Sequence, residues 1–209
     1  MKYHLILWGA LFFIFNTRPL YADTLFFGDS LTASYGDFGR KLINDNVKVE
    51  YVSGSGLLND SKKNWLHFVN NTDLSEYDNV IISLGTNDFV KYSQNDYNEY
   101  YIRLFNLISE IQNQNPLVTI IWLSPPHLKN VEHEKYLIST REIIKNGADI
   151  MQFHYIDINR PHILGTDWQS VVDGQKVRTD DGIHITQAGS RRVISELVKS
   201  MNQYENNND

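Results

Sequence analysis

The sequence predicts an α/β fold in which a parallel sheet is covered by helices on both faces. Five short apolar segments alternate along the chain with longer amphipathic segments. Three of the short segments are almost continuously hydrophobic, which is typical of strands buried on both faces. Because strands and helices alternate, we expect βαβ units with right-handed crossovers.

The predicted strands are rich in β-branched and aromatic residues, which favour extended structure. They are residues 24–28 (TLFFG), 47–52 (VKVEYV), 79–85 (NVIISLG), 117–123 (LVTIIWL) and 153–158 (FHYIDI).

Helices are expected at residues 35–46, 61–71, 96–115, 132–149 and 186–204. Segment 96–115 has the clearest pattern, because apolar side chains recur in it every three or four residues from Tyr97 to Ile111. Pro116 ends that helix, and Gly147 is predicted to end the next one.

Length and composition indicate a single globular domain at residues 23–209, expected to be a monomer. The chain has 209 residues, of which 42% are hydrophobic and 21% are charged, as in ordinary globular proteins. The formal net charge of −6 argues against a nucleic-acid partner. The chain has no cysteine and no motif with metal-ligand spacing, so neither a disulfide nor a metal site is predicted. No glycine-rich phosphate loop is present, and no cofactor is expected.

Residues 1–22 have the pattern of a secretory signal peptide. Lys2 precedes an apolar stretch at residues 5–15 that is short for a membrane span, and cleavage is expected after Ala22. An uncleaved N-terminal anchor is the alternative. No later segment of the sequence is apolar enough to cross a membrane. The prediction is a periplasmic or secreted bacterial protein, in which a domain of this size needs no disulfides.

Reactive side chains and glycines follow the predicted strands where the strands end. Because ligands of such folds bind beyond the carboxyl ends of the strands, we expect these residues to meet at one edge of the sheet. Each of them alone could belong to an ordinary turn or helix cap, but their joint order favours a functional site. They are Asp29 and Ser30 after the first strand, Gly54 and Gly56 after the second, Asn87 and Asp88 after the third, and Asp181 and His184 before the last helix.

Ser30, His184 and Asp181 are the residue types of a nucleophilic triad. A serine hydroxyl is a weak nucleophile and needs a base, here His184, within hydrogen-bond reach. A carboxylate must orient the imidazole and stabilise its charged form, and Asp181 is predicted for this role with Asp180 as a rival. Donors for the oxyanion of the tetrahedral intermediate are then expected from the Ser30 N–H, a glycine N–H of the second loop and the Asn87 amide.

These segments resemble the sequence blocks of the SGNH, or GDSL-type, serine hydrolase superfamily. The blocks are FGDSL with Ser30, SGSGLL with its glycines, LGTND with Asn87, and DGIH with His184. The resemblance covers the chain from residue 23 onwards. It implies a three-layer α/β/α, flavodoxin-like SGNH hydrolase fold with a five-stranded parallel sheet. The family spacing after the second strand favours Gly56 over Gly54 as the oxyanion glycine, and both stay open.

Two branches of the superfamily compete for the substrate. ADTLFFGDSLTASYG resembles the periplasmic acyl-thioesterase and lysophospholipase branch. SGSGLLNDSKKNWL and VRTDDGIHITQAGSRRV resemble a branch that occurs with systems for O-acetylation of cell-envelope polysaccharides. The second resemblance is favoured, because the thioesterase type has a Gly-Asp-Thr-like run where Gly56 is followed by two leucines here.

The resemblance thus implies an exported serine esterase that removes O-acyl groups, chiefly O-acetyl groups, from envelope carbohydrate through an acyl-enzyme. A lysophospholipase or acyl-thioesterase and an O-acetyltransferase of the same fold are alternatives. The alternative that is not an enzyme is an inactive polysaccharide-binding protein.

Three further features have two interpretations each. Trp65 is expected in the core, with a wall of the cleft as the alternative. His127 follows the fourth strand, and it belongs either to a substrate pocket or to a rigid surface loop. The long segment 162–181, with Trp168 and Arg178, is expected to form a rim for the substrate.

Overall fold

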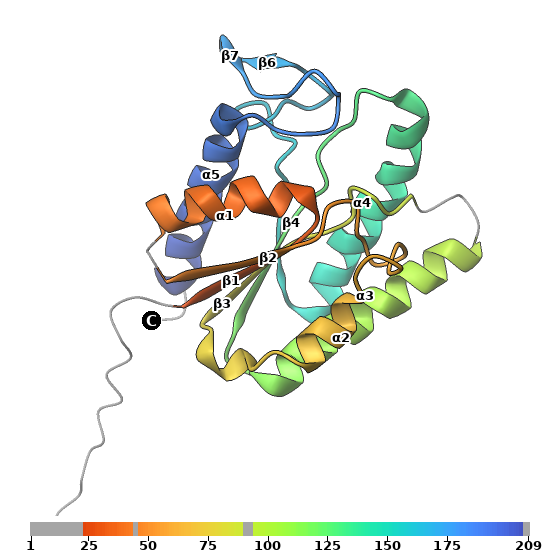
Figure 1. Cartoon of the computed structure of the whole chain (residues 1–209), viewed down its shortest axis with the longest axis vertical. Coiled ribbons are helices and arrows are strands. Elements are labelled where there is room, and N and C mark those ends of the chain that lie inside the picture. The colour runs from red at the N-terminus through yellow and green to blue at the C-terminus, as the bar shows by residue number, and fades with distance from the viewer. Residues whose placement is uncertain (1–22, 44–45, 90–93, 207–209) are drawn as a thin grey trace, which may run out of the picture.

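A computed structural model describes residues 23–43, 46–89 and 94–206 of the chain (Figure 1). Its centre is a five-stranded, all-parallel sheet with the strand order β2-β1-β3-β4-β5. The predicted three-layer fold with a five-stranded parallel sheet is confirmed. The predicted signal peptide at residues 1–22 lies outside the described residues. The strands are β1 (Thr24–Gly28), β2 (Val47–Tyr51), β3 (Asn79–Ser83), β4 (Thr119–Leu123) and β5 (His154–Ile156).

Helices cover both faces of this sheet, as Figure 1 shows. On one face lie α1 (Ser30–Leu42) and α5 (Gln187–Asn206), which pack against each other. On the other face lie α2 (Trp65–Asn70), α3 (Gln94–Gln114) and α4 (Val131–Met151). The smaller elements are a 3-10 helix, η1 (Leu74–Glu76), and a hairpin of β6 (Val171–Val172) and β7 (Gln175–Lys176). In the described parts of the chain, no helix is both long and apolar enough to cross a membrane.

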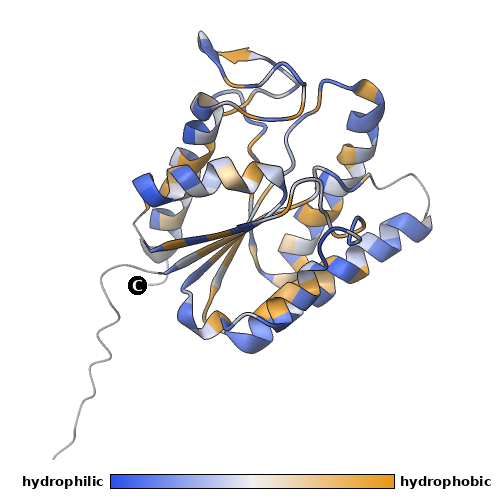
Figure 2. Cartoon of the chain, in the orientation of Figure 1, coloured by the Kyte–Doolittle hydropathy of each residue, from blue (hydrophilic) through white to orange (hydrophobic). Residues whose placement is uncertain are grey.

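Strand residues alternate between two apolar layers, because successive side chains of a strand point to opposite faces of the sheet. Phe26 and Ile81 are fully buried on the face of α1 and α5, whereas Phe27 and Ile82 are fully buried on the opposite face. In Figure 2 the apolar colour lies on the strands and on the sheet-facing sides of the helices. Burial on both faces explains why these strands are nearly continuously apolar in the sequence.

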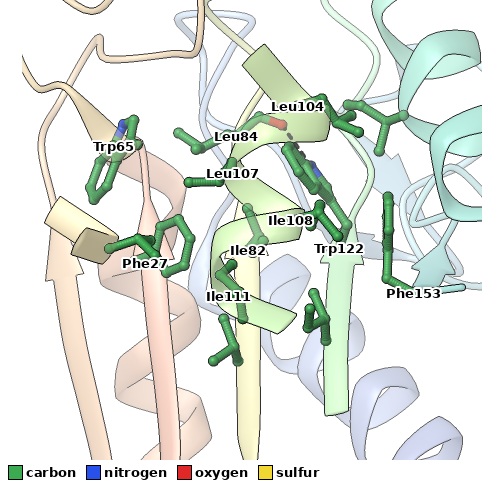
Figure 3. Packing of buried hydrophobic residues seen from close by; sticks show 14 of the residues in the cluster. Phe27, Trp65, Ile82, Leu84, Leu104, Leu107, Ile108, Ile111, Trp122 and Phe153 are labelled. Atoms are coloured by element: carbon green, nitrogen blue, oxygen red, sulfur yellow. Dashed lines mark hydrogen bonds between the residues drawn. The ribbon is translucent and has the colours of Figure 1, made fainter. Parts of the chain in front are cut away.

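Two tryptophans pack in the layer beneath α2, α3 and α4 (Figure 3). The indole N–H of Trp122 donates to the carbonyl of Leu84 at 3.0 Å. Trp65 is only 2% exposed, and its ring stacks 5.3 Å from that of Phe27. Its N–H donates to Ser55 Oγ at 3.1 Å. Trp65 is therefore a core residue, as the first of its two interpretations predicts.

Several predicted helix boundaries are wrong, and two of them have a clear structural cause. Helix α1 begins at Ser30 and not near residue 35, because Asp29 caps it and accepts the N–H of Leu31 at 3.0 Å. Helix α4 does not end at Gly147 but runs on to Met151. An added Cβ at Gly147 would press against a leucine of α3. This glycine therefore serves close helix packing and is not a helix cap.

Candidate active site

The structure joins Ser30, His184 and Asp181 in one chain of hydrogen bonds. Ser30 Oγ lies 2.9 Å from Nε2 of His184, and Nδ1 of His184 lies 2.7 Å from Oδ2 of Asp181. At these distances a histidine can take the serine proton while a carboxylate holds its other ring nitrogen. Asp180, the rival carboxylate, is turned away and accepts a hydrogen bond from Lys176 Nζ at 2.7 Å.

The second oxygen of Asp181 is held by three donors. Its Oδ1 accepts the hydroxyl of Thr179 at 2.6 Å, the N–H of Ile183 at 2.8 Å and the N–H of His184 at 2.9 Å. Slight burial opposes their effect, but these bonds hold the pKa of Asp181 well below its ordinary value. The side chains of His184 and Asp181 are 42% and 47% exposed, so a substrate can reach the triad from solvent.

Ser30 is the first residue of α1 and directly follows the turn at the carboxyl end of β1. A residue at this position has a backbone N–H without an acceptor inside the helix. The positive end of the helix dipole lies at the same point and favours negative charge there. The turn therefore places the Ser30 hydroxyl beside a backbone N–H that can bind an anion, because Asp29 caps the helix one residue earlier.

Asn87 and Asp88, which follow β3, tie the third loop to the glycine loop after β2. Asn87 Nδ2 donates to the carbonyl of Ser55 at 2.9 Å, and the amide carries a second N–H that can serve a ligand. The buried carboxylate of Asp88 accepts the N–H groups of Leu57 and Leu58, each at 2.8 Å. The sequence indicated only a turn at Asp88, because these partners lie 31 and 30 residues away.

The two glycines of the second loop have different surroundings. Gly56 packs against Asp88, whose carboxylate an added Cβ would overlap, and its N–H makes only a long bond of 3.4 Å to the carbonyl of Asn59. Gly54 has a φ of +75° and its carbonyl accepts the Asn59 amide at 2.6 Å, so it forms the turn. Ser55, whose carbonyl Asn87 contacts, lies between the two glycines in the chain.

The sequence predicts Arg178 and Trp168 at a rim of the site and His127 in a pocket or a surface loop, and the structure agrees only in part. Arg178 does not belong to a rim, because its side chain is fully buried. Trp168 is half-buried, with Lys129 Nζ 5.2 Å from the centre of its ring. His127 lines a cavity of about 350 Å³ beside α4, and its Nδ1 lies 2.7 Å from Glu134. Among the described residues, no group of three or more histidine, aspartate or glutamate side chains could hold a metal ion.

A family described as "Protein of unknown function (DUF459)" matches residues 23–200. The chain belongs to this family. The match includes Ser30, Asn87, Asp181 and His184, so the whole candidate site of this DUF459 chain lies within the family's boundaries. No curated protein sequence matches the chain.

Solved structures of esterases share the fold of this DUF459 chain. A carbohydrate acetylesterase from Sinorhizobium meliloti is 19% identical with a TM-score of 0.63, and the match covers 87% of this chain and 98% of that one. An aryl esterase from M. smegmatis is 18% identical with a TM-score of 0.62, covering 86% and 98%. A peptidoglycan O-acetylesterase is 19% identical with a TM-score of 0.57, covering 76% of this chain and 47% of that one. These likenesses confirm the predicted SGNH-type fold.

Asp29 gives this DUF459 chain a pH-dependent stability that can be measured. The carboxyl group is fully buried, and its burial raises its pKa to about 7. Since the folded state binds a proton that the unfolded state has released, Asp29 contributes stability at low pH. That stability is lost as the pH rises from about 4 to about 7, by at most about 1.4 kcal/mol per pH unit.

Asp29→Asn removes this titration and keeps an acceptor for the Leu31 N–H. Urea unfolding across the same pH range is expected to show the wild type losing stability relative to the variant as the pH rises. Asp73→Asn is the matched control, because Asp73 caps η1 in the same way but is exposed. Hydrogen bonds from Ser75 lower the pKa of Asp73, so its contribution has the opposite sign and is lost as the pH falls. A difference between wild type and Asp29→Asn that does not vary with pH would contradict the assignment.

Proposed function

We propose that this chain is a serine ester hydrolase that removes acetyl groups from the hydroxyls of carbohydrate. The observation that supports it most is the hydrogen-bonded series of Ser30, His184 and Asp181 at the carboxyl edge of the sheet. In agreement with its predicted signal peptide, we propose that the chain acts as an exported monomer on sugars of the cell envelope. Two proteins of the same fold are named as a carbohydrate acetylesterase and a peptidoglycan O-acetylesterase, which supports this substrate class.

The first half of the reaction forms an acyl-enzyme. Ser30 Oγ bonds to the ester carbonyl carbon, and its proton passes to His184 Nε2, 2.9 Å away. The carbonyl electron pair moves onto oxygen, which becomes the oxyanion. When this intermediate collapses, the bond between the acyl carbon and the sugar oxygen breaks, and His184 returns the proton to that oxygen. Asp181 keeps the imidazole in one tautomer and stabilises its charged form throughout.

The second half releases the acid. Water gives a proton to His184 and bonds to the acyl carbon, and Ser30 Oγ leaves with the proton that His184 returns. The oxyanion of both intermediates is proposed to accept hydrogen bonds from the Ser30 N–H, the Asn87 amide and the Gly56 N–H. For Gly56 this requires exchange of its long bond to Asn59 for the stronger bond to an anion.

Hydrolysis of a series of p-nitrophenyl esters, from acetyl to dodecanoyl, tests the proposed reaction and its acyl group together. We expect kcat/KM to be highest for the acetyl ester and to fall as the chain lengthens. We also expect the purified protein to release acetate from acetylated oligosaccharide, and a fluorophosphonate to stop both reactions by labelling Ser30.

Other outcomes of this experiment point to the competing functions. A maximum at long acyl chains would replace the acetyl esterase with a lysophospholipase or thioesterase. Labelling of Ser30 without hydrolysis, together with acetyl transfer to an added sugar, would indicate a transferase. If Ser30 is not labelled and no ester is hydrolysed, the result would indicate a binding protein that retains the fold.

A further inference from the structure

Arg178 and Thr179, two residues that precede Asp181 and His184, form hydrogen bonds with the loop that carries them. We propose that these two are positioning residues, which fix the backbone and the carboxylate of the triad so that His184 faces Ser30. The kinetic part of this inference rests on the proposed esterase function, whereas its spectroscopic part does not.

The guanidinium of Arg178 donates hydrogen bonds to two successive carbonyls of this loop. Its Nη2 donates to the carbonyl of Ile183 at 2.8 Å, and its Nε donates to that of His184 at 3.3 Å. Its side chain is fully buried, and Arg178 also pairs with Ile185 in an isolated antiparallel bridge. The planar guanidinium can hold both carbonyls at once, which the single ammonium of a lysine cannot do in the same geometry.

Burying an arginine without a direct ion pair is costly for a protein. Burial lowers the pKa of Arg178, and Tyr35, Asp181 and Glu134 only partly oppose this shift. Its remaining nitrogen, Nη1, has no hydrogen-bond partner among the described residues. An apolar side chain could fill this space without that cost. Both hydrogen bonds of the guanidinium go to carbonyls of the loop that carries the triad. This indicates that the role of the buried charge is to position this loop.

Thr179 holds the same loop through its backbone and its hydroxyl. Its N–H donates to the carbonyl of His184 at 3.0 Å. Its Oγ1 lies 2.6 Å from Asp181 Oδ1 and 3.1 Å from the carbonyl of His184. A hydroxyl has one proton to donate, and the shorter distance assigns it to the carboxylate. Oδ1 is thereby occupied, and Oδ2 is left to face the imidazole.

Thr179→Val tests this role with little change in side-chain volume. We expect kcat for p-nitrophenyl acetate to fall about tenfold, with KM changed by less than about twofold. Thr179→Ser keeps the hydroxyl and should restore most of the rate. The matched control is Thr72→Val, because the half-buried Thr72 follows α2, away from the site, and its hydroxyl also donates to a carbonyl, that of Phe68, at 2.8 Å. This control should leave kcat unchanged.

Proton NMR gives a readout that does not depend on turnover. The proton on His184 Nδ1, shared with Asp181, should give a low-field resonance that disappears in His184→Ala. We expect this resonance to broaden or shift in Thr179→Val and to remain in Thr179→Ser and Thr72→Val. A resonance and a kcat in Thr179→Val that both equal those of Thr72→Val would overturn the proposal.

Arg178→Lys tests the arginine in the same assays, because lysine keeps the positive charge but lacks the planar guanidinium that holds both carbonyls. We expect a loss in kcat of about tenfold and a perturbed Nδ1 resonance in a folded protein. Wild-type kcat combined with a lowered melting temperature would restrict Arg178 to a role in stability and overturn its part of the proposal. If the lysine variant fails to fold, the Thr179 variants alone decide the inference.

The two proposals can fail separately. If the wild type hydrolyses no ester but Thr179→Val still perturbs the Nδ1 resonance, the function is wrong and the positioning inference stands. If the wild type hydrolyses esters and Thr179→Val behaves like Thr72→Val in both assays, the inference is wrong and the function stands.

Discussion

Ser30→Ala and His184→Ala are each expected to lower kcat for ester hydrolysis by about 10⁴-fold or more, and the double variant is expected to be no slower than either. The reason is that the hydroxyl and the imidazole, 2.9 Å apart, act as one unit. Without the base the hydroxyl is not activated, and without the hydroxyl the base has no proton to take. Burst and steady-state measurements with p-nitrophenyl acetate check this expectation.

Ser34→Ala is the matched control for the nucleophile, because Ser34 lies one turn further along α1 and contacts no residue of the triad. Its hydroxyl donates to the carbonyl of Leu31 and accepts a hydrogen bond from Ser190 of α5. The Ser34→Ala variant should keep wild-type kcat and should still be labelled by a fluorophosphonate. Losses that multiply in the double variant would mean that Ser30 and His184 act independently, which contradicts a shared proton transfer.

The two neighbouring aspartates give a geometric control on the same reaction. Asp181→Asn is expected to lower kcat by about 10²-fold to 10⁴-fold, because the amide can no longer hold the imidazole in the required tautomer. Asp180→Asn should leave kcat nearly unchanged, since this carboxylate contacts Lys176. Equal losses in both variants would contradict the assignment of Asp181.

Gly28→Ala is expected to lower the free energy of unfolding by about 3–5 kcal/mol. Gly28 ends β1 with a φ of +153°, a conformation that residues with a Cβ rarely adopt. An added Cβ would also overlap the carbonyl of Ser83, which accepts the N–H of Asp29 at 3.0 Å. The alanine must therefore push β1 apart from β3, the central strand of the sheet. Urea unfolding of wild type and variant measures the loss.

Gly174→Ala separates the backbone conformation from the overlap. Gly174 has a φ of +73°, but an added Cβ there would meet no atom within 4 Å. This variant should lose only about 1 kcal/mol, the cost of a left-handed residue with a side chain. If Gly28→Ala loses no more than Gly174→Ala, the close approach of β1 to β3 is not what requires glycine at position 28.

Local patterns in the sequence were sufficient to predict where the five strands of the sheet lie. The strand prediction at 24–28 coincides with β1, and the others overlap β2 to β5, because burial on both faces leaves an apolar run that can be read locally. The start of α1 could not be read in this way, because Asp29 and Ser30 suit a turn as well as a helix start. Further along α1, Gly36 and Gly39 lower the helix propensity, but they allow the helix to lie close to Val49 and Phe26. Packing thus outweighs local preference in this helix.

The order of the sequence blocks was enough to name Ser30, Asn87, Asp181 and His184 as candidates, since parallel strands bring their carboxyl ends to one edge. Only the tertiary structure decided that Asp181 and not Asp180 meets the imidazole, that Arg178 lies beneath the loop and not at a rim, and that Asp88 anchors the glycine loop. These contacts depend on loop conformation and on residues that are distant in the chain. A sequence determines which residue types are present and in what order, but the distance between two side chains follows from how the strands and loops pack.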